Sequence, residues 1–235
     1  MKKLLALALV LALTLSLSAA ALADDDLITV NGMATVSVPA DMATVMLGVT
    51  TLDKDVQKTA ALNAERIEAV VFALKELGIP EADITTNNYY MDTMYDYNVT
   101  DENGYAIRGY QVSNTINVTV RNLDLVGQVV DTALRAGANQ VNSVAFQSTK
   151  SGEACDEALR QAIAEARRKA ELAAAAGGVK LGKLANITEN YGSYNGVMMK
   201  TVEAAAEDRG VANTRFMASG LDCSATVTVS FEIGE

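Results

Sequence analysis

The alternation of apolar and polar residues between Val112 and Val120 constrains the fold of this chain most strongly. Most residues on one side of that stretch are Val or Ile, and those on the other side are Ser, Thr or Asn. A period of two with one polar face is typical of a strand that buries only one face. The sequence therefore predicts a core strand here, in a sheet that is covered on one side.

This strand belongs to a longer stretch, from Tyr89 to Asn139. A first arm ends near Tyr97, a polar tip spans 98–104, and a second arm begins at Tyr105. An apolar run with helical spacing then ends near Gly137, where the small residue is suited to stop a helix. The pattern predicts a long hairpin whose second arm leads into a helix.

Six of the eight tyrosines lie on the predicted hairpin. They are Tyr89, Tyr90, Tyr95, Tyr97, Tyr105 and Tyr110. One interpretation is an exposed recognition or assembly surface, since tyrosine offers contact area at low entropic cost. The other is a set of cross-strand aromatic pairs that stiffen the hairpin. Both interpretations stay open at this point.

Along the rest of the chain, pairs of strands or single strands alternate with helices. Further strands are predicted at 28–38, 43–50, 84–97, 141–147, 184–189 and 221–232, and helices at 53–77, 123–134 and 153–176. The first two strands are expected to form a hairpin through the turn at 39–41. The order β-β-α-β-β-α-β-α-β-β predicts an α+β fold, a mainly antiparallel sheet built from hairpins with helices packed on one face. Residues 190–219 lack a clear period and are expected to form a long loop.

The two longer predicted helices should each bury one stripe of side chains. The first stripe comprises Val56, Ala60, Ile67, Val70, Val71, Leu74 and Leu77. The second comprises Cys155, Leu159, Ala162, Ile163, Ala166 and Ala170. Asp53 or Asp55 is expected to cap the first helix by accepting hydrogen bonds from its unsatisfied backbone N–H groups.

The first 23 residues have the pattern of a secretory signal peptide. Two lysines precede an uncharged apolar run that ends in Ala21-Leu22-Ala23. This pattern predicts cleavage before Asp24, leaving a domain over 24–235 with no stable transmembrane segment, although an uncleaved anchor is the alternative. An extracytoplasmic bacterial location is expected, whether periplasmic, cell-surface or secreted.

Composition removes several classes of function. The net charge of −10 disfavours nucleic acid as a partner, because an acidic protein repels phosphate. The chain has no histidine, which excludes His-based catalytic triads and His-ligated zinc. No catalytic residue, cofactor or metal site is therefore assigned.

Two further motifs fall short of a chemical site. Gly177–Lys183 has glycine spacing like a phosphate-binding loop, but it follows a helix and Leu184 stands where a hydroxyl would bind magnesium. The acidic group Asp92, Asp96, Asp101 and Glu102 lacks the glycine of a calcium-binding loop, and the chain has no tryptophan to form a glycan platform. We interpret the first as a helix stop and the second as a solvated tip.

The two cysteines, Cys155 and Cys223, lie on the apolar sides of a predicted helix and a predicted strand. After export they would meet an oxidising compartment, where a disulfide closing a loop of about 69 residues would contribute roughly 4 kcal/mol. Two buried free thiols are the alternative.

Several spaced blocks make the chain similar to the SIMPL-domain (DUF541) family. They are Ile28–Asp41, Tyr95–Tyr110, Ser113–Asp124, Ala136–Asn142 and Asp156–Lys183. The resemblance covers about 27–235 and implies an exported bacterial protein of the periplasmic immunogenic type. Members of the family include a ring-like multimer and proteins linked to oxidative-stress tolerance, and the family offers no catalytic residues to transfer. Cys155 departs from the family pattern, which favours a large residue there, so a disulfide would be local to this chain.

These observations give a leading hypothesis of a non-enzymatic, self-assembling protein of the cell envelope or secreted space. It would be a homo-oligomer, with an envelope protein as a possible partner and envelope or oxidative stress as a possible context. The alternative is a binding module for a small molecule, glycan or partner protein that uses the Tyr-rich hairpin. An envelope hydrolase has the least support.

Overall fold

The computed structural model describes residues 26–101, 104–190, 214–218, 220 and 221–234. The chain divides into two compact units. Of the described residues, one unit comprises 26–35, 157–190 and 224–234, and the other comprises 36–101, 104–156, 214–218 and 220–223. We call them the terminal unit and the central unit, and each is described by itself.

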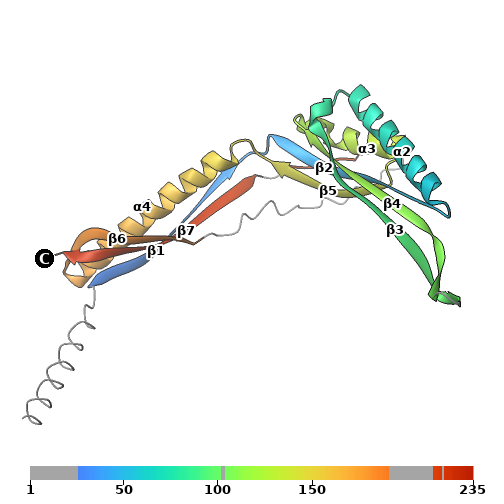
Figure 1. Cartoon of the computed structure of the whole chain (residues 1–235). Coiled ribbons are helices and arrows are strands. Elements are labelled where there is room, and N and C mark those ends of the chain that lie inside the picture. The colour runs from blue at the N-terminus through green and yellow to red at the C-terminus, as the bar shows by residue number, and fades with distance from the viewer. Residues whose placement is uncertain (1–25, 102–103, 191–213, 219, 235) are drawn as a thin grey trace, which may run out of the picture. The chain divides into compact units, whose positions relative to one another are not determined.

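The central unit is built on a four-stranded antiparallel sheet in the order β3-β4-β2-β5 (Figure 1). Its strands are β3 (Ile84–Asp101), β4 (Gly104–Val120), β2 (Met42–Asp53) and β5 (Gln140–Gln147). Strand β4 lies inside the sheet: Val118 pairs with Val45 of β2 on one side and with Ile84 of β3 on the other. The prediction of a core strand at 112–120 is confirmed.

Helices α2 (Val56–Glu76) and α3 (Val126–Ala136) cover one face of this sheet (Figure 1). Alternate residues of the strands and one side of each helix form the core, including Val45, Leu47, Val49, Ile116, Val118, Val70, Leu74, Val126 and Val129. Helix α3 ends at Gly137, whose φ of 118° is accessible to glycine at little cost. The predicted helix stop therefore lies where the sequence indicated.

Most of the predicted stripe of α2 is confirmed, since Val70 and Leu74 are buried and Ile67, Val71 and Leu77 pack against the core, but the first half of the helix departs from it. The residues that the helix buries are Thr59, Asn63, Val70 and Leu74, whereas Val56 is exposed. The Asn63 amide donates to the backbone oxygens of Val49 and Val112, at 2.9 and 3.2 Å. Because hydrogen bonding removes most of the cost of burying a polar group, the first half of α2 docks through polar side chains. The predicted cap is formed by Asp55, which accepts a hydrogen bond from the Lys58 amide at 2.9 Å.

The terminal unit contains the sheet β1-β7-β6, formed by β1 (Leu27–Val38), β7 (Leu221–Gly234) and β6 (Lys180–Asn190). The predicted hairpin between the first two strands is therefore wrong. Strand β1 pairs with the last strand, β7, and the hydroxyls of Thr29 and Ser230 form a hydrogen bond of 2.9 Å across this pair. Strand β2 has no edge left for β1, because β4 and β5 occupy both of its sides.

Helix α4 (Ser151–Gly177) packs on this sheet through alanines spaced four residues apart. In the terminal unit these are Ala158, Ala162, Ala166, Ala170 and Ala174, all nearly inaccessible. The predicted stripe shares three of them, but Leu159 and Ile163 are only half-buried. A Cβ built on Gly32 of β1 would lie 1.9 Å from the Ala162 carbonyl oxygen. The small residues on both partners allow this close approach.

The element order and the α+β class, with mainly antiparallel pairing, are confirmed. Among the described residues, no helix combines the length and the apolar character needed to cross a membrane. The signal peptide predicted at 1–23 lies outside the described residues, as does most of the loop predicted at 190–219.

Candidate interaction surface

The β3–β4 hairpin continues past the edge of the sheet as a two-stranded ribbon. Strand β2 pairs with β4 only as far as Asp53 opposite Tyr110. Beyond that pair, β3 and β4 pair with each other from Thr93 opposite Tyr110 to Asp101 opposite Gly104. Figure 1 shows this end of the hairpin extending past the helices of the central unit. A two-stranded hairpin alone is marginally stable in water, so this ribbon has little support within its own unit.

The predicted tyrosines lie along this hairpin, and most of them are exposed. Tyr97 is 71% exposed and Tyr105 is 53% exposed. Tyr89, Tyr90 and Tyr95 are also exposed, whereas Tyr110 is half-buried where the ribbon leaves the sheet. We call the paired segments 93–101 and 104–110 the Tyr ribbon.

One aromatic pair forms within the ribbon. The rings of Tyr97 and Tyr105 meet edge to face, with centroids 5.1 Å apart and an angle of 68° between their planes. This geometry is the one that aromatic quadrupoles favour. A cross-strand pair and a large exposed aromatic area thus occur together, so the two interpretations of the tyrosines are compatible.

The carboxylates of the first arm are held by nearby backbone. Asp92 accepts a hydrogen bond from the Thr93 amide at 2.8 Å, and Asp96 accepts one from the Asn98 amide at 3.0 Å. A hydrogen bond from the Tyr90 hydroxyl to Asp92 raises the pKa of the tyrosine. In the described part of the chain, no cluster of three or more His, Cys, Asp or Glu side chains could hold a metal.

The sheet face opposite α2 and α3 carries uncharged polar residues. Between the pairs Thr44–Thr119 and Thr50–Ser113, its other positions are Met46, Gly48, Thr115 and Asn117. Hydroxyls and amides bond to one another across it: Asn117 Nδ2 donates to Asn87 Oδ1 at 3.2 Å, and Thr50 Oγ1 donates to Ser113 Oγ at 3.1 Å. Between these two pairs the face carries no charged side chain, so no charge repulsion opposes contact with another surface.

Residues 28–231 match the model of the SIMPL family, described as "Protein of unknown function (DUF541)". This chain belongs to the SIMPL family. It is 33% identical to the 26 kDa periplasmic immunogenic protein of Brucella melitensis over 165 residues, which are 69% of this chain and 65% of that protein. It is 29% identical to the uncharacterized protein YggE of Escherichia coli K12 over 174 residues, 74% of this chain and 69% of that one. The chain thus spans about 65% of the length of its Brucella relatives.

The two cysteines of this SIMPL chain lie together. Cys155 on α4 and Cys223 on β7 have their Cα atoms 5.2 Å apart, and their sulfur atoms are joined. The sequence pattern placed both cysteines on apolar faces of their elements. Only the structure shows that the helix and the strand lie close enough for a bond.

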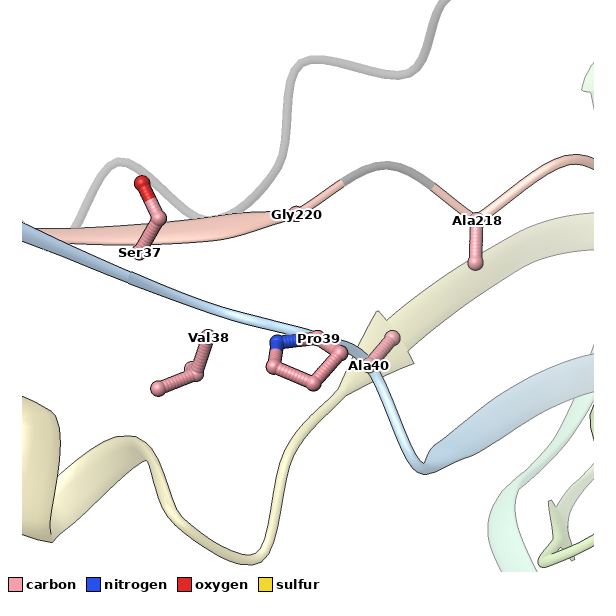
Figure 2. A pocket seen from close by; sticks show the side chains of 6 residues that line it. All are labelled: Ser37, Val38, Pro39, Ala40, Ala218 and Gly220. Atoms are coloured by element: carbon pink, nitrogen blue, oxygen red, sulfur yellow. The ribbon is translucent and has the colours of Figure 1, made fainter.

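A shallow pocket of about 430 Å³ lies near the end of β1 (Figure 2). Figure 2 shows its lining residues, which are Ser37, Val38, Pro39, Ala40, Ala218 and Gly220. The Ser37 hydroxyl donates to the Asp222 carboxylate and is therefore already engaged. A ligand site usually has several polar groups aimed at one point, and this lining offers few, so the pocket gives no basis for a reaction.

The glycine-rich segment at 177–183 has the context of a helix end. Helix α4 runs to Gly177, Gly178 has a φ of 73°, and β6 begins at Lys180. A phosphate-binding loop instead runs from a strand into the N-terminus of a helix, whose backbone N–H groups bind the phosphate. The helix-stop interpretation therefore agrees with the geometry.

The sequence analysis did not predict a buried hydrogen-bonding carboxylate on α3. The buried Asp131 carboxylate accepts a hydrogen bond from the Thr214 hydroxyl at 2.7 Å and from the Thr214 amide at 3.3 Å. One turn earlier, a Cβ on Gly127 would lie 1.8 Å from the Thr214 carbonyl oxygen. An acidic residue amid the apolar residues of this helix was the available signal. The contact fastens the segment 214–218 to the central unit.

Proposed function

We propose that this SIMPL-family protein is an exported, non-enzymatic protein that self-assembles in the cell envelope or the secreted space. The observation that carries the proposal is the Tyr ribbon, which leaves its own sheet and exposes aromatic side chains. Aromatic residues are enriched in protein interfaces, and large exposed apolar patches often serve as contact sites. The uncharged polar face of the central sheet offers a second surface that another subunit can approach.

Export is supported by the signal-like residues 1–23 and by the relatives from Brucella, whose name describes them as periplasmic. The Cys155–Cys223 bond suits an oxidising compartment. The non-enzymatic assignment is supported by the absence of histidine from the chain and by carboxylates that are engaged with local backbone. A link to envelope or oxidative stress rests on the family resemblance, and growth of a deletion strain under peroxide would test it.

Self-assembly is tested by size-exclusion chromatography with light scattering on residues 24–235. We expect a mass of several subunits that falls on dilution. A strictly monomeric protein at high concentration would refute the proposal. Location is tested separately by fractionating cells that express the full chain, with N-terminal sequencing expected to give Asp24.

The second candidate is a binding module in which the ribbon receives a small molecule, a glycan or a partner protein. The exposed faces of Tyr95, Tyr97 and Tyr105 favour it, because tyrosine rings can stack on sugars and pack on protein surfaces. A ligand that raises the melting temperature of the wild type, but not of Tyr97→Ala/Tyr105→Ala, would support it. A rise of equal size in both proteins would place the ligand elsewhere.

A further inference from the structure

Positive charge is concentrated in one part of this acidic chain. The whole chain carries a net charge of −10, yet residues 160–183 contain six Lys or Arg and two Glu. They lie on the second half of α4 and on the start of β6, in the terminal unit. The second half of α4 and the start of β6 are therefore locally basic within an acidic chain.

The side of α4 that faces away from its buried alanines forms a continuous stripe. We call it the Arg stripe: Arg160, Ala164, Arg167, Arg168 and Leu172, at successive spacings of four, three, one and four residues. The side chains of Arg160 and Arg167 are 69% and 70% exposed, although they bridge to Glu157 and Glu171 at 3.0 and 3.1 Å. Leu172 is 64% exposed beside them. Three guanidinium groups and a leucine thus share one accessible helix face.

The Tyr ribbon has the complementary chemistry. Its first arm belongs to β3, which contains three Asp residues and no Lys or Arg between Ile84 and Asp101, whereas its second arm carries one exposed arginine, Arg108. Exposed Tyr95, Tyr97 and Tyr105 stand near Asp92 and Asp96 along the hairpin. Guanidinium groups stack on tyrosine rings and pair with carboxylates, so an aromatic and acidic ribbon fits an arginine-rich helix.

We propose that the Tyr ribbon of one copy docks on the Arg stripe of a second copy, in a head-to-tail contact. This inference rests on the proposed self-assembly and names the two surfaces that form it. The choice of a second copy as the occupant follows from charge complementarity between two surfaces of the same chain. Because the two surfaces differ, a one-way contact leaves one ribbon and one stripe open for a further copy, whereas reciprocal docking closes a dimer.

The test uses charge reversal on each surface. Arg167→Glu/Arg168→Glu reverses the stripe. Asp92→Lys/Asp96→Lys reverses one carboxylate inside the ribbon and one directly before its first arm. Each variant alone places like charges in contact, so its assembly midpoint should move to at least about tenfold higher protein concentration. An equal mixture of the two variants should assemble again, because each reversed surface then meets an opposite charge on the other variant.

A matched control carries the same change of charge away from both surfaces. Arg66→Glu/Lys150→Glu alters two exposed basic residues by the same charge as the stripe variant and should assemble like the wild type. Sedimentation velocity measures the assembly, and circular dichroism with thermal melting checks that each variant is folded. If Arg167→Glu/Arg168→Glu melts early, Arg160→Glu/Arg168→Glu tests the same stripe. Higher salt should weaken wild-type assembly, since partly exposed ion pairs are screened.

The outcomes separate the two proposals. If the wild type assembles and the reversed variants assemble equally well, the head-to-tail contact is refuted while self-assembly stands. If the wild type is monomeric at every concentration, both are refuted. If each variant dissociates but the mixture does not recover, the two surfaces are not partners. Binding to phosphatidylglycerol vesicles that is lost in Arg167→Glu/Arg168→Glu, with assembly unchanged, would assign the stripe to a lipid surface and overturn the contact.

Discussion

Replacing Gly32 by alanine tests the packing between β1 and α4 in the terminal unit. The added Cβ would lie 1.9 Å from the Ala162 carbonyl oxygen and 2.9 Å from Ala166 Cβ, whereas real Cβ atoms essentially never approach closer than 3.0 Å. The helix or the strand must therefore shift by about 1.1 Å, which a densely packed interior resists. The opposing atom belongs to backbone, so no side chain can rotate to relieve the clash.

Overpacking of this kind costs roughly 1–3 kcal/mol, and the backbone clash places Gly32→Ala at the upper end. The alanine also reduces the conformational freedom of the unfolded chain, which offsets about 0.4–1 kcal/mol. We expect a net loss of about 2 kcal/mol, or roughly 4–8 °C in melting temperature for a chain of this size. The shift would also lengthen the hydrogen bond from the Met33 amide to Glu165, now 2.6 Å.

The assay is urea unfolding followed by circular dichroism, with amide hydrogen exchange to locate the weakened elements. Gly152→Ala in the first turn of α4 is the matched control, because nothing lies within 4 Å of its Cβ position. That variant should match the wild type or be more stable by up to about 1 kcal/mol. Equal stability of Gly32→Ala and wild type would show that the contact is looser than the structure has it, and would refute the reasoning.

Three further predictions concern other contacts. Cys155→Ser/Cys223→Ser should lower stability by about 4 kcal/mol, because the bond closes a loop with a sequence separation of 68, and thiol titration of the unfolded wild type without reductant should find no free thiol. Asp131→Ala should cost about 1–3 kcal/mol, since it removes a buried acceptor of the Thr214 hydroxyl, and protease cleavage near 214 should become faster. The pKa of Glu165 is lowered from its usual 4.5, first by the hydrogen bond from the Met33 amide and then by the nearby Lys169. The stability this carboxylate contributes is present above pH 4.5 and is lost as the pH falls through its lowered pKa; carboxyl NMR titration measures that pKa, and Glu165→Gln should remove this part of the acid sensitivity.

Part of the fold follows directly from local pattern. The alternation at 112–120 predicted a core strand, and Gly137 marked the end of a helix, because burial of one face and the freedom of glycine act within a few residues. Only the first half of the α2 face was misassigned, because Thr59 and Asn63 are polar side chains that tertiary hydrogen bonds allow to be buried. A sequence pattern ranks side chains by polarity, and it cannot show which backbone oxygens will lie opposite them.

The sequence predicted which residues the Tyr ribbon contains, but it did not predict how far the ribbon extends beyond the sheet. The crowding of tyrosines between Tyr89 and Tyr110 is visible in the sequence. That the last part of the hairpin has only two strands depends on where β2 ends against β4, at Asp53 opposite Tyr110. The Arg stripe is visible as a helical repeat once the buried alanines define the opposite side of α4.

The sequence by itself determined which face of most strands is buried, where the helices end, the absence of histidine chemistry and the membership of the SIMPL family. Only the tertiary structure decided that β1 pairs with β7 instead of β2, that α4 packs closely on Gly32, and that Cys155 bonds to Cys223. The reason is physical. Side-chain periodicity records burial residue by residue, whereas strand pairing uses backbone donors and acceptors that nearly every residue shares. The choice among strand edges therefore rests on contacts between segments far apart in the chain.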